Sequence, residues 1–151
     1  CVLKRDRHNN IVKTLNKMKV NIEFITDGDV SGVISVIDND SPIDIYLGVG
    51  GGPEGVLAAA ALTCYGGQMQ TRLILNEHEQ KKAMNLGITD FKKKYNIDEM
   101  VKGDVIFCAT GITDGKLVKG IVNTKDSFHA STFALHKSTG IVKKITNNHK
   151  K

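Results

Sequence analysis

A single carboxylate, Glu54, closes a run of glycines that joins an apolar stretch to an alanine-rich one. Pro53 precedes it, and because proline favours the start of a helix, the sequence predicts that a helix begins here. Glu54 then lies in the first turn, where the positive end of the helix dipole stabilises its negative charge. Backbone N–H groups at a helix start bind phosphate oxygens, and carboxylate oxygens bind hard divalent cations. We therefore expect Glu54 to be a metal ligand beside a bound phosphate.

Two other interpretations of the glycine loop stay open. Gly50, Gly52 and Gly55 match the G-x-G-x-x-G spacing of a dinucleotide-binding oxidoreductase domain, with an acidic residue about 20 positions further on. The charge of Glu54 counts against this, because a pyrophosphate bound there has no metal to offset the repulsion. The simplest interpretation is a tight turn in which the glycines only permit positive φ. A Walker A loop is excluded, since no Lys-Ser or Lys-Thr follows the glycines.

Two aspartates flank a glycine at the end of an earlier apolar stretch, as Asp27-Gly28-Asp29. Ligand sites in open α/β sheets lie beyond the carboxyl ends of strands, so we expect this turn and the glycine loop to converge. The aspartate oxygens suit either hydrogen bonds from sugar hydroxyls or coordination of a metal. The simpler alternative is that Asp29 only caps the helix that follows and that Asp-Gly only makes the turn.

A basic segment near the start of the chain contains Arg5, Asp6 and Arg7. On an extended segment, side chains two residues apart point the same way, so both arginines would reach one phosphate, which arginine binds bidentately. If the segment begins a helix instead, the arginines diverge, and the interpretation as a solvated basic stretch gains weight.

Together with two later segments, these motifs resemble one protein family. They occur in the order Arg5-Asp6-Arg7-His8, Asp27-Gly28-Asp29-Val30, Gly48-Val49-Gly50-Gly51-Gly52-Pro53-Glu54-Gly55-Val56, Gly66-Gly67-Gln68-Met69-Gln70-Thr71-Arg72-Leu73 and Ala109-Thr110-Gly111-Ile112-Thr113-Asp114-Gly115. The set is similar to the class II fructose-1,6-bisphosphatases of the bacterial GlpX type, over essentially the whole chain. Two positions depart from the family pattern, since Gly52 stands where alanine is usual and Asp6 where proline is common. Neither departure removes a charged group that the site needs.

The resemblance implies a hydrolase of gluconeogenesis that removes the 1-phosphate of fructose 1,6-bisphosphate, using Mg²⁺ or Mn²⁺, to give fructose 6-phosphate and phosphate. It implies that Glu54 is a metal ligand and that Gly51 approaches the substrate by its backbone. It also implies substrate-binding roles for the aspartates and the basic segment. In that assignment Asp27, Gly28 and Asp29 line the sugar, and Arg5, Asp6 and Arg7 lie at the phosphate-binding end.

The same resemblance implies that residues 1–151 are the C-terminal half of such an enzyme. An N-terminal half, absent from this chain, would supply most of the metal-binding carboxylates and the groups that position the attacking water. We therefore expect no catalytic residue in this chain and no phosphatase activity from it alone. The fold implied is a layered α/β sandwich with a mixed sheet, of the lithium-sensitive sugar-phosphatase type, in a homo-oligomer.

Composition agrees with a globular piece of an enzyme. A length of 151 residues with 40% hydrophobic and 25% charged residues predicts one domain rather than a disordered chain. The longest apolar run, at residues 56–62, is too short to span a bilayer, so we expect no membrane contact. Three cysteines without C-x-x-C spacing fit a reducing, cytoplasmic compartment. The net charge of +5 comes from lysine clusters without interleaved aromatic residues, so we expect no nucleic-acid partner.

Hydrophobic spacing predicts alternating helices and strands, followed by a strand-rich end. The expected helices span residues 9–19, 30–37, 53–65, 77–86 and 90–95. The expected strands span residues 21–25, 43–47, 68–75, 104–109, 117–123, 127–135 and 141–145. Gly66 and Gly67 are expected to end their helix in a left-handed cap. The alternation in the last strands predicts antiparallel pairing.

Overall fold

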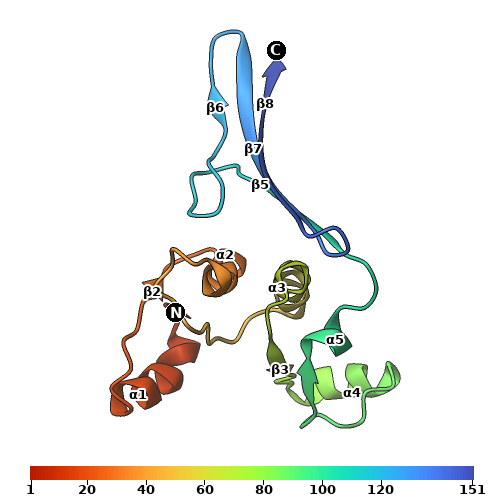
Figure 1. Ribbon diagram of the computed structural model, residues 1–151. Coiled ribbons are helices and arrows are strands. Elements are labelled where there is room, and N and C mark those ends of the chain that lie inside the picture. The colour runs from red at the N-terminus through yellow and green to blue at the C-terminus, as the bar shows by residue number, and fades with distance from the viewer.

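Helices and short strands alternate over the first hundred residues, and long antiparallel strands follow (Figure 1). The computed structural model describes residues 1–151. The strands form separate small sheets, so the chain is a mixed α/β structure rather than one large sheet. The elements are β1 (Val2–Leu3), η1 (Asp6–His8), α1 (Asn9–Lys17), β2 (Phe24–Ile25), α2 (Asp29–Ile34), η2 (Ser35–Ile37), α3 (Gly52–Tyr65), β3 (Gln70–Arg72), α4 (Glu77–Asn85), β4 (Lys94–Asn96), α5 (Ile97–Met100), β5 (Ile106–Thr110), β6 (Val122–Asn123), β7 (Ser127–His136) and β8 (Ile141–Lys150).

Three segments from different parts of the sequence lie side by side at the start of the fold. β1 pairs in parallel with β2, with Val2 opposite Phe24. Residues 45–47 run along the other side of β1, because the Leu47 N–H donates to the Cys1 carbonyl at 3.1 Å and the Cys1 amino group donates to the Ile45 carbonyl at 2.7 Å. These bonds bring the starts of η1, α2 and the glycine loop to the same region. The expected strand at residues 43–47 is therefore an extended segment without a full ladder, and β1 was not expected.

Local sequence signals place the main helices where they were expected. α4 begins with a capping box, in which Asn76 accepts from the Glu79 N–H and Glu79 accepts from the Asn76 N–H. α3 ends at Gly66, whose φ of 72° is the left-handed conformation that glycine adopts without strain. The expectation that Asp29 caps α2 is wrong. The cap position is held by Gly28 with φ of 75°, and Asp29 is the first residue of the helix.

A short antiparallel pair, β3 with β4, joins the middle of the chain, with Thr71 opposite Tyr95. The expected helix at residues 90–95 is wrong, because its last residues are taken into this pair. A second capping box, made by Asn96 and Glu99, then starts α5, a helix that was not expected. The expected strand at residues 68–75 is confirmed only in its centre.

The C-terminal sheet is antiparallel, as expected. β7 is its central strand and pairs with β5 and β6 along one edge and with β8 along the other. One face of this sheet contributes Phe107, Phe133 and Leu135 to the core, where they pack with Ala61 of α3 and Ile34 of α2. A second, smaller cluster joins α3 to α2 through Val33, Ala58 and Leu62. α3 is thus the element on which the sheet and α2 both pack, as its central position in Figure 1 shows.

Candidate metal and phosphate site at the glycine loop

Glu54 lies in the first turn of α3, as expected, and its carboxylate folds back over the glycine loop. A Cβ atom built on Gly51 would lie 3.1 Å from the Glu54 Cδ and closer still to Oε2. The absence of a side chain at Gly51 therefore permits the position that the carboxylate occupies. Both residues are exposed, so the carboxylate oxygens are open to a ligand from solvent.

His8 anchors the loop that leads to this carboxylate. Its side chain is 1% exposed, and its Nδ1 lies 2.6 Å from the Leu3 carbonyl while the Val49 N–H donates to its Nε2 at 2.8 Å. Nε2 must be unprotonated to accept that bond, so Nδ1 carries the proton and donates to Leu3. The imidazole, 41 sequence positions from Val49, thus ties β1 to the glycine loop. No local spacing in the sequence indicates such a distant partner for His8.

The basic segment does not adopt the extended form that a shared arginine fork requires. Arg5 is extended, but Asp6 and Arg7 already belong to η1, so the arginines diverge. Arg7 Nε donates to the Val49 carbonyl at 2.6 Å, whereas Arg5 Nη1 donates to the neighbouring Lys4 carbonyl at 2.8 Å. Only Arg7 of this segment is hydrogen-bonded to the glycine loop. Arg7 as a whole is exposed to solvent beside that loop.

The acidic turn converges with the glycine loop through Asp29. A Cβ atom at Gly50 would lie 3.7 Å from the Asp29 Oδ2, so this carboxylate stands directly beside the loop. Its Oδ1 accepts from the Val30 N–H at 2.9 Å. Asp27 accepts from the Gly28 N–H at 2.8 Å and remains exposed. The structure therefore brings Asp29, Arg7 and Glu54 to one loop and leaves Arg5, Asp6 and Asp27 exposed on the surface around it.

Tyr46 is a member of this cluster that sequence reasoning missed. Its ring packs against Gly32 of α2, where an added Cβ would lie 3.0 Å from the Tyr46 Cε2, and its hydroxyl stands next to Gly48. Burial raises the pKa of the Tyr46 phenol, the negative charge of Asp29 raises it further, and Arg7 opposes them. The phenol therefore stays protonated and is a neutral hydrogen-bond donor between an acid and a base. The only indication in the sequence that Tyr46 belongs to the site is its position just before the glycine loop.

The donor set fits a hard cation only in part. Glu54 offers the carboxylate oxygens that Mg²⁺ and Mn²⁺ prefer. No group of three or more His, Cys, Asp or Glu side chains in the chain is arranged to hold a metal ion. A cation bound at Glu54 would therefore need further ligands from outside these residues.

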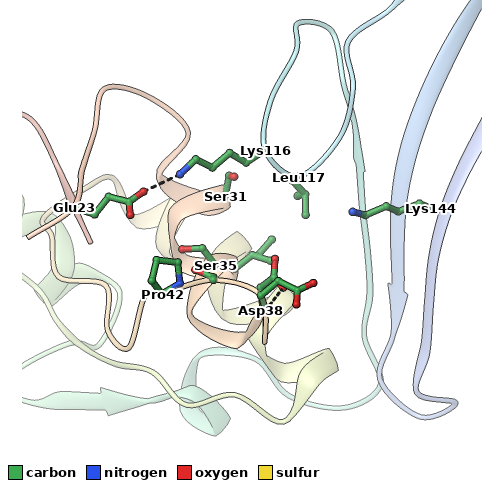
Figure 2. Close-up of a pocket in the computed structure, with 11 residues that line it drawn as sticks. Glu23, Ser31, Ser35, Asp38, Pro42, Lys116, Leu117 and Lys144 are labelled. Atoms are coloured by element: carbon green, nitrogen blue, oxygen red, sulfur yellow. Dashed lines mark hydrogen bonds and ion pairs between the residues drawn. The ribbon is translucent and has the colours of Figure 1, made fainter.

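A polar cavity of about 260 Å³ lies elsewhere, between α2, the segment that follows η2, and β8 (Figure 2). Its walls include Glu23, Asp38, Lys116 and Lys144, and none of the residues expected in the site lines it. The Lys116 ammonium donates to Glu23 at 2.8 Å, and this bond lowers the pKa of the Glu23 carboxyl. The ion pair links the segment between β5 and β6 to the residue that precedes β2. The cavity is therefore separate from the glycine loop.

An acid at a helix start, an aspartate and an arginine around a glycine loop in a mixed α/β fold are features of a metal-dependent phosphatase. The comparison with known families agrees, because the model for bacterial fructose-1,6-bisphosphatases, glpX-encoded, matches residues 1–149. The chain belongs to this family.

Curated relatives carry the same kind of name. A D-fructose 1,6-bisphosphatase class 2/sedoheptulose 1,7-bisphosphatase 2 of Acaryochloris marina is 36% identical over 80% of this chain and 38% of its own length. Two D-fructose 1,6-bisphosphatase class 2/sedoheptulose 1,7-bisphosphatases of Synechococcus strains are 35% identical over 80% of this chain and 39% of their own. The chain thus spans less than half the length of the relatives it matches. None of these comparisons supports a dinucleotide-binding oxidoreductase.

No helix of the chain combines the length and the apolar composition that crossing a bilayer requires.

Proposed function

We propose that this chain is the C-terminal part of an enzyme that hydrolyses the 1-phosphate of fructose 1,6-bisphosphate with Mn²⁺ or Mg²⁺. The observation that supports this most directly is the Glu54 carboxylate, held over Gly51 at the start of α3 with Asp29 and Arg7 at the same loop. A carboxylate ligand, a phosphate-binding cation and a hydrogen-bond acceptor for sugar hydroxyls are what a metal-dependent sugar phosphatase needs from one wall of its site.

Each residue has chemistry suited to its role. Glu54 is one ligand of a divalent ion, which supplies charge neutralisation at the phosphoryl oxygens when bound. Asp27, Gly28 and Asp29 line the sugar, with the carboxylates accepting hydrogen bonds from its hydroxyls. Arg5, Asp6 and Arg7 lie at the phosphate-binding end, where Arg7 binds the phosphate beside the glycine loop and the diverging Arg5 does not share it. Gly51 presents its backbone to the substrate.

The remainder of the site belongs to an N-terminal part of the same enzyme. Phosphoryl transfer to water needs several oxygen ligands to hold the metal ions, and this chain offers one. We therefore propose that residues 1–151 alone have no phosphatase activity. The complete enzyme has a lithium-sensitive phosphatase-like fold, forms a homo-oligomer and works in the cytoplasm.

The decisive experiment replaces Glu54 by glutamine in the complete protein and measures phosphate release from fructose 1,6-bisphosphate as Mn²⁺ is varied. Loss of a direct ligand should lower turnover at limiting Mn²⁺ by at least about 100-fold. Glu77→Gln is the matched control, because Glu77 is also an exposed first-turn glutamate, on α4, and stands outside the site. Equal activity of the two variants would contradict the proposal. Sedoheptulose 1,7-bisphosphate should be assayed in parallel, since the relatives' names include it.

A further inference from the structure

One flank of α3 is apolar and uncovered. Val56 is 47% exposed and Leu57 is 52% exposed, although both are large aliphatic residues within one turn of Glu54. From Gly55 to the end of the helix at Tyr65 there is no charged side chain. A helix that is apolar around its whole circumference is stable in the interior of a protein, with other structure on every side.

Helical geometry places the uncovered side chains on one face. The packed residues Ala58, Ala61 and Leu62 face α2 and the C-terminal sheet, and Ala59 is also buried. The opposite face, which we call the α3 flank, follows from the period of 3.6 residues per turn. It consists of Pro53, Val56, Leu57 and Ala60. Cys64, one turn further on, already packs against the core beside the C-terminal sheet.

The rest of the chain does not cover this flank. α3 packs on α2, α5, β5 and β7, and these elements account for its buried face (Figure 1). Only 16 of the 151 residues are buried, which is few for a chain long enough to build a full core. An uncovered apolar flank in the middle of such a fold is therefore a surface suited to contact with structure outside residues 1–151.

We propose that the α3 flank is covered by the upstream part of the same enzyme, an inference that rests on the function proposed above. The matched region is the C-terminal part of the relatives and amounts to 38% of one of them, so most of a relative's length lies outside it. Leu57 is three residues from Glu54, which places it on the next turn of the same helix. A segment seated on Val56 and Leu57 thus brings its own carboxylates to the one metal ligand that this chain supplies.

A second copy of this chain is a less suitable partner for the α3 flank than the upstream part. Each copy carries a net charge of +5, so two copies repel one another over their surfaces. The flank itself has no charged group that would offset this repulsion across a symmetric contact. Under the proposed function the upstream part supplies further carboxylate ligands, whose negative charge complements the net positive charge of this chain.

The test is side-chain footprinting of the complete protein with a photoactivated carbene, which labels exposed aliphatic residues. Labelling of each residue is compared with the same residue in the urea-unfolded protein. Leu57 and Val56 should be labelled at least about tenfold less in the native state, as in the core of a protein interface. Leu86, which is 80% exposed, is the matched leucine control for accessible labelling. Native labelling of Leu57 within about twofold of the unfolded level would overturn the proposal.

The identity of the occupant is tested in the same protein with a photo-cross-linking amino acid at position 57. A cross-link to a peptide upstream of Cys1 within one polypeptide supports the proposal. In a mixture of ¹⁴N- and ¹⁵N-labelled protein, cross-links between the two labels would assign the flank to a second copy and overturn it. Phosphate release is measured separately on unmodified protein. Protection of Leu57 without hydrolysis would reject only the proposed function, and hydrolysis with Leu57 accessible would reject only this inference.

Discussion

Replacing Gly51 by alanine should separate the position of the Glu54 carboxylate from the stability of the fold. The backbone at Gly51 has φ of −68° and ψ of 151°, which alanine adopts without strain. The new methyl group, however, would occupy the space of the Glu54 carboxylate, with its Cβ 3.1 Å from Cδ and closer to Oε2. Because the end of a glutamate side chain rotates easily, the carboxylate should move while the helix stays in place.

The expected magnitudes follow from these two effects. Alanine is a poorer cap residue than glycine, so the Gly51→Ala change should cost about 1 kcal/mol of unfolding free energy at most. Displacing a metal ligand without removing it should weaken Mn²⁺ binding by about 10- to 100-fold, the range found when residues that orient a ligand are changed. The assay is the Mn²⁺ concentration for half-maximal hydrolysis in the complete protein, together with urea denaturation of the same samples.

Gly52→Ala is the matched control for this experiment. A Cβ atom at Gly52 meets nothing within 4 Å, and the residue is the first of α3. Alanine there should leave Mn²⁺ dependence unchanged and stabilise the helix by up to about 1 kcal/mol. If both variants bind Mn²⁺ as the parent protein does, the carboxylate does not depend on the glycine beneath it, and the argument from Gly51 to Glu54 is refuted.

Two further predictions concern the surroundings of the site. His8→Leu should lower the unfolding free energy of the complete protein by about 2 to 5 kcal/mol, since it leaves the buried Leu3 carbonyl and Val49 N–H without partners. Urea denaturation measures this, and a loss below about 1 kcal/mol would show that the imidazole does not anchor the loop. Hydrogen bonds from Ser138 and His136 lower the pKa of Asp104 to about 2, from an ordinary value of 3.8. The ionised Asp104 carboxylate should therefore stabilise the turn between β7 and β8 fully above pH 3.8. This stabilisation should be lost as the pH falls through about 2. Amide exchange at Ser138 should follow this titration, and an Asp104→Asn variant that keeps the same pH dependence would contradict it.

Features set by neighbouring residues were predictable from the sequence. The first-turn position of Glu54, the capping box of α4 and the left-handed Gly66 all depend on residues within a few positions of one another. Glycine, proline and capping residues have the same conformational preferences in any fold. The starts of α1, α3 and α4 were therefore expected correctly to within one residue.

Features set by contacts between residues far apart in the sequence were not predictable from it. β4 forms where a helix was expected, because Tyr95 pairs with Thr71 across the fold. Tyr46 and His8 join the site through contacts with α2 and with Val49 that no local pattern encodes. The same limit applies to Arg5 and Arg7, whose divergence depends on whether η1 forms.

The outer strand of the C-terminal sheet has a consequence for handling this protein. β8 spans Ile141–Lys150, every one of its residues is exposed, and β7 is its only partner. Such an edge offers unpaired backbone groups to any other extended chain and so invites fibril-like aggregation. Positive charges lie along this edge at Lys143, Lys144 and Lys150. They oppose edge-to-edge pairing of two copies, because the second copy would bring the same charges against them. High salt screens that repulsion, so the isolated chain should stay monodisperse longest in dilute buffer.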